Sequence, residues 1–199
     1  MSHCHDHHHD QPFDRAFLIA IVANSLFVVV QVVYALYANS TGLLADAIHN
    51  LGDVMGLVLA WVAVVLMRRK ATSKATYGYK KTSILAAMAN GLFLVFTCGI
   101  IAAESVVKFV SAPPVDGVLV MWVAAIGILV NGASAVLFWR GGHDLNIKAA
   151  FLHLFYDALI SLGVVISGAC IYWKGWSWVD PLTGLLIAGI ILYGTWGIF

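Results

Sequence analysis

The sequence contains few charged residues and no marked excess of either sign. Lysine, arginine, aspartate and glutamate together make up 11% of the 199 residues, whereas hydrophobic residues make up 61%. A soluble domain usually carries about 25% charged residues. The composition therefore excludes an ordinary soluble domain and indicates an integral membrane protein. The formal net charge is only +1, which gives no reason to expect nucleic acid as a partner.

Several motifs that would indicate catalysis or redox chemistry are missing. The three cysteines, Cys4, Cys98 and Cys170, have no CxxC spacing, so we expect no disulfide. The nucleotide-binding pattern GxxxxGK[ST] is absent, and so is the HExxH pattern of zinc proteases, because Glu104 is the only glutamate. These absences argue against ATP as an energy source and against an intramembrane metalloprotease. We expect that the protein is not an enzyme.

Long hydrophobic runs, by contrast, are abundant. A transmembrane helix needs about 20 mostly apolar residues to cross roughly 30 Å of hydrocarbon, and six segments come close to this length or exceed it. The segments between them carry turn-forming residues. The sequence therefore predicts an all-α integral membrane protein with six transmembrane helices. The expected spans are residues 17–37, 43–67, 83–109, 115–138, 149–173 and 181–199.

The basic residues fall mainly on one side of these spans. Nine of the eleven precede the first span or lie between the second and third or the fourth and fifth, and only Lys108 and Lys174 lie on the other side. Cytoplasmic loops are enriched in lysine and arginine, so both termini are predicted to be cytoplasmic. Residues 1–14 are expected to form a disordered, histidine-rich cytoplasmic tail, either weakly metal-collecting or inert, and residues 15–199 the six-helix transmembrane domain.

Two pairs of ionisable residues interrupt the apolar spans. His49 and Asp53 lie four residues apart in the second span, and His153 and Asp157 have the same spacing in the fifth. Residues four apart share one face of a helix. At about 1.5 Å per residue, Asp53 lies roughly 15 Å from the outer boundary and Asp157 roughly 12 Å from the inner boundary of a core about 30 Å thick. The two aspartates are therefore expected to meet near the midplane.

These four side chains have the composition of a zinc site. Two imidazoles and two carboxylates match the ligand types and the number of ligands of tetrahedral Zn²⁺, and two ionised aspartates would balance the charge of the ion in a low dielectric. The alternative is an interhelical hydrogen-bond network with protonated carboxylic acids. The matched spacing and depth favour a metal site made by His49, Asp53, His153 and Asp157.

Other polar residues in the spans have simpler interpretations. Asp46 either bonds to a backbone or polar group or relays protons at the outer mouth, and the sequence leaves both open. Glu104 and Lys108 are four apart and predict a structural ion pair. Asn24 and Asn90 are interpreted as interhelical hydrogen-bonding groups, and Asn24 could also support a metal ligand from behind.

Five segments carry a resemblance to a known family. They are NSLFVVVQVVYALYANSTGLLADAIHNLGD, TYGYKK, ESVVKFVSAPPVDG, HDLNIKAAFLHLFYDALISLGV and VDPLTGLLIAGIILYGTW. With these segments the sequence resembles the transmembrane part of the cation diffusion facilitator family, the divalent-metal/proton antiporters. The resemblance implies six helices with cytoplasmic termini, and it implies that His49, Asp53, His153 and Asp157 are the transport-site ligands.

The resemblance also implies a function. The expected substrate is Zn²⁺, with Cd²⁺ and Co²⁺ as further candidates, exported from the cytoplasm in exchange for protons. Protonation of the histidine ligands on the acidic side would expel the metal. The expected location is the cell membrane as a multi-pass protein, or the inner membrane in a Gram-negative bacterium, in contact with lipid. The alternatives are a passive metal channel and a metal-binding membrane protein that does not transport.

The sequence departs from the family pattern in three places. Family members usually continue past the sixth helix into a cytoplasmic ferredoxin-like domain that helps to hold a dimer, whereas this sequence ends at Phe199. A short member and a piece of a longer protein are both open, and a homodimer stays a candidate. Residues 68–81 contain no histidine, aspartate, glutamate or cysteine, so no further metal site is expected there. The chain also reads YGYKKTS where the family often has YGYxRxE.

Overall fold

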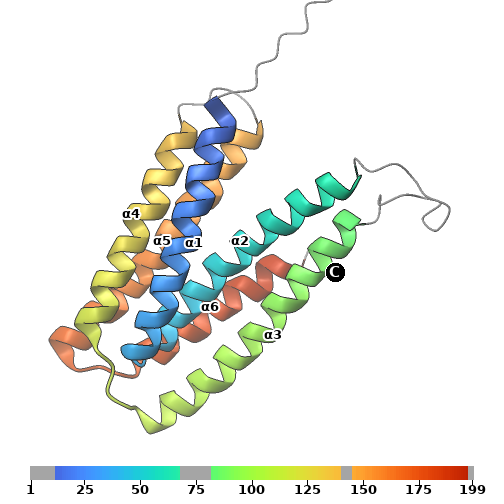
Figure 1. Ribbon diagram of the computed structural model, residues 1–199. Helices are drawn as coiled ribbons and strands as arrows, with labels where there is room; N and C mark the ends of the chain where they lie inside the picture. The colour runs from blue at the N-terminus through green and yellow to red at the C-terminus, as the bar shows by residue number, and fades with distance from the viewer. Residues whose placement is uncertain (1–11, 68–81, 140–144, 197–199) are drawn as a thin grey trace, which may run out of the picture.

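The computed structural model describes residues 12–67, 82–139 and 145–196, and these residues form six helices (Figure 1). This confirms the all-helical class, and each helix coincides with a predicted span to within a few residues at either end. Of the tail predicted at residues 1–14, residues 1–11 lie outside the described residues and residues 12–14 belong to the first helix instead of a disordered segment. The prediction for the basic run at 68–81 also lies outside the described residues. The helices are α1 (Pro12–Tyr37), α2 (Thr41–Met67), α3 (Thr82–Ser111), α4 (Gly117–Trp139), α5 (Leu145–Lys174) and α6 (Val179–Thr195).

The apolar character of the helices agrees with a membrane protein. Within the described residues, three helices are long and apolar enough to cross a membrane, namely Ile84–Ser111, Gly117–Val136 and Phe151–Lys174. Ile21–Tyr37 and Val179–Thr195 are shorter apolar helices. Large apolar side chains cover the exposed surface of α3, as expected for a face that meets lipid. Six spans with cytoplasmic termini remain a prediction.

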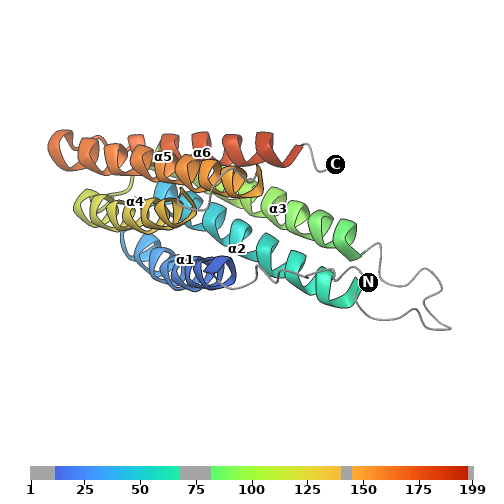
Figure 2. The same ribbon diagram turned by 90° about the horizontal axis from the view of Figure 1, so that it is seen from above.

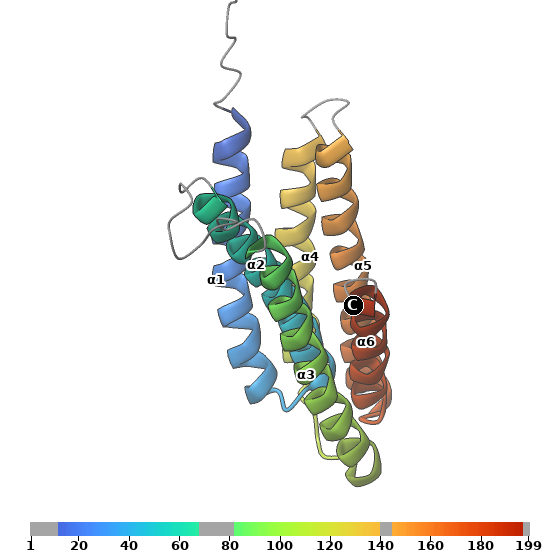
Figure 3. The same cartoon turned by 90° about the vertical axis from the view of Figure 1, so that its right-hand side faces the viewer.

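The helices form two groups that diverge toward one end. In Figure 1, α1, α4 and α5 stand side by side, whereas α2, α3 and α6 lean away from them; the views in Figures 2 and 3 also show α6 beside α5, with which it is in contact. Helix α2 packs against α1, α3, α5 and α6. It therefore joins the two groups, together with the direct contact between α5 and α6. A cluster of buried apolar residues drawn from all six helices fills the contacts between them.

Helices α4 and α5 pack together most extensively, and glycine makes their close approach feasible. A Cβ atom on Gly168 of α5 would lie 2.8 Å from the carbonyl oxygen of Gly117 and 2.9 Å from the backbone nitrogen of Met121, both in α4. Small residues at helix contacts of this kind are typical of membrane proteins, where packing rather than hydrophobicity holds helices together. The α4–α5 pair thus gives α5 a fixed support.

The amino terminus of α2 is held by an aspartate from α6. The Asp180 carboxylate accepts hydrogen bonds from the backbone N–H groups of Thr41 (2.7 Å) and Gly42 (3.3 Å) and from the Thr41 hydroxyl (3.0 Å). The Ser40 hydroxyl donates to the same carboxylate and accepts from the N–H of Leu43 (3.0 Å). Free N–H groups and the helix dipole favour a negative charge at this position. Asp180 therefore fixes the start of α2 against α6.

Candidate metal site

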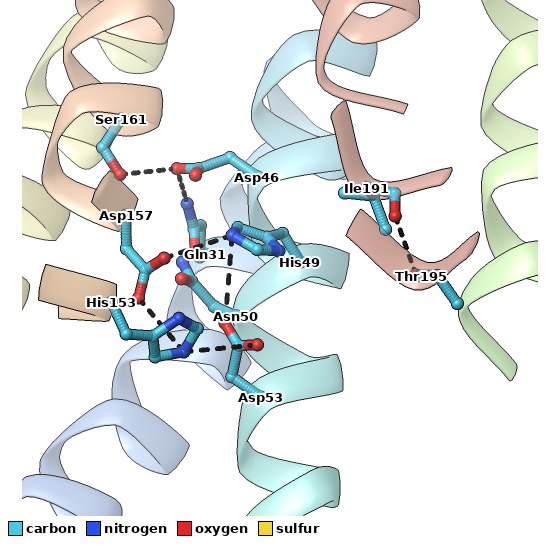
Figure 4. A network of polar contacts seen from close by, with 10 residues as sticks. All are labelled: Gln31, Asp46, His49, Asn50, Asp53, His153, Asp157, Ser161, Ile191 and Thr195. Atoms are coloured by element: carbon cyan, nitrogen blue, oxygen red, sulfur yellow. Dashed lines mark hydrogen bonds and ion pairs between the residues drawn. The ribbon is translucent and has the colours of Figure 1, made fainter. Parts of the chain in front are cut away.

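The structure brings the four predicted ligands together between α2 and α5. His49 Nε2 lies 3.2 Å from Asp157 Oδ1 and 3.9 Å from Asp53 Oδ2. His153 Nε2 lies 3.5 Å from Asp53 Oδ1 and 3.7 Å from Asp157 Oδ2. Each imidazole nitrogen therefore faces a carboxylate oxygen from its own helix and one from the opposite helix. Figure 4 shows the four side chains converging in this way.

These separations can be compared with the coordination geometry of zinc. Zn²⁺ binds imidazole nitrogen and carboxylate oxygen at about 2.0–2.2 Å, so neighbouring ligand atoms at the corners of a tetrahedron lie about 3.3–3.6 Å apart. The two nitrogen–oxygen contacts between the helices, 3.2 Å for His49 with Asp157 and 3.5 Å for His153 with Asp53, are close to that spacing. The four contacts use both oxygens of each aspartate, so the side chains would have to rearrange to place one atom each around a single ion.

Burial differs among the four side chains. Asp157 is 5% exposed, His49 15%, Asp53 25% and His153 51%. Ligand atoms of His49, Asp53 and Asp157 all lie within 4.8 Å of one another, so these three form the tighter group and His153 forms its open edge. Asp53 Oδ2 is buried, and no described residue hydrogen bonds to it. A bound cation would supply the partner that this oxygen lacks.

Asp46 lies one turn from His49 and belongs to a separate buried network. Its Oδ2 accepts hydrogen bonds from Gln31 Nε2 of α1 (2.6 Å) and from the Ser161 hydroxyl of α5 (3.0 Å). Asn50 Nδ2 donates to Gln31 Oε1 (3.1 Å). The interpretation that Asp46 bonds to polar groups is thus confirmed, and its use as a proton relay stays a prediction. Gln31, Asn50 and Ser161 belong to this network although no motif spacing in the sequence indicates them.

The predicted ion pair at the end of α3 is confirmed and has a structural role. Lys108 Nζ lies 2.9 Å from Glu104 Oε1 and donates to the carbonyl oxygen of Asn39 (3.1 Å). Asn39 sits in the α1–α2 turn with a left-handed φ of 56°, a conformation that asparagine tolerates better than most residues. The pair therefore ties α3 to this turn.

The two asparagines behave differently from the prediction. No hydrogen bond to the side chain of Asn24 is found among the described residues. Asn90 Oδ1 is buried, and it too has no hydrogen-bond partner in the described part of the chain. Gln31, two turns beyond Asn24 on α1, is the α1 residue that bonds to α2, through Asp46 and Asn50.

Comparison with known proteins identifies the family. Residues 17–199 match the family described as the cation efflux transmembrane domain. The chain belongs to the cation efflux family. This confirms the resemblance found in the sequence, and it agrees with an integral membrane transporter rather than an enzyme.

Named relatives of the cation efflux family cover almost the whole chain. It is 32% identical over 190 residues to the cadmium, cobalt and zinc/H(+)-K(+) antiporter of Bacillus subtilis and 35% identical over 202 residues to the zinc transporter ZitB of Escherichia coli. It is 33% identical over 193 residues to the metal cation efflux system protein CzcD of Cupriavidus metallidurans. These matches take in 94%, 98% and 96% of the chain but only 61%, 64% and 61% of the relatives. The chain thus spans about three fifths of their length.

Proposed function

We propose that this protein is a secondary transporter that exports a divalent metal ion, foremost Zn²⁺, from the cytoplasm in exchange for protons. The transport site consists of His49, Asp53, His153 and Asp157. The observation that carries the proposal is the convergence of two imidazoles and two carboxylates from α2 and α5, with nitrogen–oxygen contacts of 3.2 and 3.5 Å between the two helices, near the spacing of neighbouring ligands around zinc. The names of the relatives, which include zinc, cadmium and cobalt antiporters, agree with this substrate class.

The chemistry of the site accounts for exchange with protons. Imidazole must be neutral to bind a metal ion, so a proton and the ion compete for the same nitrogen. Two neutral imidazoles and two carboxylates around Zn²⁺ carry no net charge, and the same is true when a proton replaces the ion on each imidazole. The site can therefore alternate between metal and protons without leaving an unbalanced charge in a low dielectric.

The topology proposed for this function has six spans with both termini in the cytoplasm of a cell-membrane protein. Successive helices run in opposite directions, and the turns α1–α2, α3–α4 and α5–α6 lie together at one end (Figure 1). In the sequence, nine of the eleven basic residues precede the first predicted span or lie between the second and third or the fourth and fifth. Enrichment in lysine and arginine assigns that side of the membrane to the cytoplasm. A homodimer is part of this proposal as a candidate assembly.

Zinc flux into proteoliposomes under an imposed pH gradient tests the function. The wild-type chain should move zinc against protons, and Asp157→Asn, which removes a negative ligand with little change of shape, should reduce the flux to background. Asp116→Asn is the matched control, because Asp116 is an exposed carboxylate that accepts from the N–H of Leu119 at the start of α4. Normal flux in Asp157→Asn would refute the site.

The same assay separates the alternatives. Zinc flux that ignores the pH gradient and moves no protons would indicate a passive channel. Zinc binding to the purified protein without any flux would indicate a metal-binding membrane protein that does not transport. Parallel measurements with Cd²⁺ and Co²⁺ show which of the ions carried by the relatives this chain accepts.

A further inference from the structure

Among the residues that the structure describes, Gln31 is the one member of the polar network around Asp46 that comes from α1. Its side chain is fully buried, and both ends of its amide are used: Nε2 donates to Asp46 Oδ2 at 2.6 Å, and Oε1 accepts from Asn50 Nδ2 at 3.1 Å. Asp46 and Asn50 are four residues apart, so they lie on one face of α2. A single glutamine of the neighbouring helix therefore hydrogen bonds to two successive turns of α2 (Figure 4).

The face of α2 that bonds to Gln31 lies next to the face that carries the proposed metal ligands. His49 directly precedes Asn50 in the sequence, and successive residues of a helix are about 100° apart. The face with Asp46 and Asn50 and the face with His49 and Asp53 are thus neighbours on the same two turns of α2. Any rotation or shift of α2 that broke the bonds to Gln31 would also turn His49 and Asp53 relative to α5.

Ser161 completes the link between the helices. Its hydroxyl donates to the same Asp46 oxygen that accepts from Gln31, so α1, α2 and α5 meet at one buried carboxylate. Asp157 lies one turn before Ser161 on α5. The network consequently joins the two helices that supply ligands at a level one turn away from the ligands themselves.

We propose that Gln31 is a positioning residue of the metal site, which sets the rotation of α2 so that His49 and Asp53 face the ligands of α5. This inference rests on the proposed function, because it assumes that these four residues bind the metal. Metal sites depend on ligands held within about 0.5 Å of their productive positions. The two hydrogen bonds of Gln31 fix the position of α2, although α1 contributes none of the four proposed ligands.

Zinc affinity of the detergent-solubilised full chain, measured by competition with a chromophoric chelator, tests the proposal. Gln31→Leu keeps much of the volume but removes both hydrogen bonds, and it should weaken zinc binding about 10-fold or more, as is common when a group supporting metal ligands is lost. Asn24→Leu is the matched control on the same helix, since no hydrogen bond to Asn24 is found among the described residues. It should bind zinc as the wild type does.

A second variant separates positioning from simple packing. In Gln31→Glu the new carboxylate can still accept a hydrogen bond from Asn50. It repels the neighbouring Asp46 carboxylate, however, unless one of the two carries a proton and donates it to the other. The ratio of its zinc affinity to that of the wild type should therefore rise toward one as the pH falls. The four proposed ligands are the same in both proteins, so their own effects on zinc binding largely cancel in this ratio. A lost packing contact alone would give a ratio that does not change with pH.

The outcomes distinguish this inference from the proposed function. Wild-type zinc affinity in a folded Gln31→Leu protein, while His49→Ala abolishes binding, would overturn the positioning role and leave the site intact. If the wild type bound no zinc, or if His49→Ala had no effect, the proposed function itself would fail. Should Gln31→Leu not fold, the pH dependence of the Gln31→Glu ratio decides: a rising ratio supports the inference, and a constant ratio overturns it.

Discussion

Replacement of Asp180 by alanine should destabilise the protein more than any other single loss of a carboxylate outside the metal site. Asp180 is fully buried, and it accepts from the backbone N–H groups of Thr41 and Gly42 and from the hydroxyls of Ser40 and Thr41. Alanine removes all four bonds. It leaves two backbone donors at the start of α2 without an acceptor, in a region from which water is excluded.

The size of the effect follows from these contacts. Loss of an ordinary helix cap costs about 1 kcal/mol, whereas each buried donor left without an acceptor costs about 1–3 kcal/mol. Because two backbone donors lose their acceptor, we expect Asp180→Ala to cost about 2–6 kcal/mol. Asp180→Asn keeps one oxygen acceptor but loses the charge that favours the helix amino terminus, so about 1–2 kcal/mol is expected for that variant. The larger loss would be a substantial part of a total stability of about 5–15 kcal/mol.

Thermal unfolding in detergent, followed by the loss of helical circular dichroism, measures the effect. Asp116→Ala is the matched control, because it removes an exposed carboxylate that accepts a single backbone hydrogen bond, from the N–H of Leu119. The expected order of stability is wild type, Asp116→Ala, Asp180→Asn and Asp180→Ala. If Asp180→Ala unfolded at the same temperature as Asp116→Ala, the capping of α2 from α6 would not contribute as the geometry implies.

Three further results are expected. His49→Asp replaces a neutral ligand by a third carboxylate and should still move zinc while accepting Cd²⁺ or Mn²⁺ relatively better, which competition of each ion against zinc in vesicles would show; an unchanged selectivity ratio would contradict it. Removal of residues 1–12 should change the apparent zinc affinity or the rate of zinc transport only modestly, because a tail can raise the local metal concentration but does not supply the ligands of the transport site. Complete loss of zinc flux by the folded, truncated protein would contradict this. Gly168→Ala should lower the free energy of unfolding by about 1–3 kcal/mol through overpacking. Gly189→Ala is the control and should not lower it, because nothing lies within 4 Å of the new methyl group. Equal melting temperatures of the two variants would argue against close α4–α5 packing.

The helices could be predicted from the sequence because each is an apolar run of about the length that crosses a bilayer. Their ends were less predictable. The fifth helix begins at Leu145 rather than at residue 149, and the first begins at Pro12 rather than at residue 17. Hydropathy marks only the apolar part of a helix, whereas backbone hydrogen bonding continues into the more polar residues on either side. Boundaries derived from composition therefore came out too short at these ends.

The pairing of α2 with α5 could also be predicted, because equal spacing and equal depth are properties of each helix alone. The contacts of Gln31 and Asp180 could not be predicted in the same way. Asp180 binds the N–H of Thr41, 139 residues away in the sequence, and Gln31 reaches Asp46 on a different helix. Such contacts depend on how helices turn toward one another. An isolated glutamine within the apolar run VVVQVV was the signal that could have drawn attention to α1.

The exposure of the four proposed ligands shows that the site has a buried side and an open side. His49 and Asp157 are 15% and 5% exposed, whereas Asp53 and His153, each one turn farther from the α1–α2 turn, are 25% and 51% exposed. On the closed side of the site, Asp46 joins α1, α2 and α5, and beyond it Asp180 holds the start of α2. On the open side the two helix groups diverge (Figure 1). An ion would therefore reach this arrangement from the side of His153, which is the cytoplasmic side in the proposed topology, and its release to the other side would require the Asp46 network to loosen.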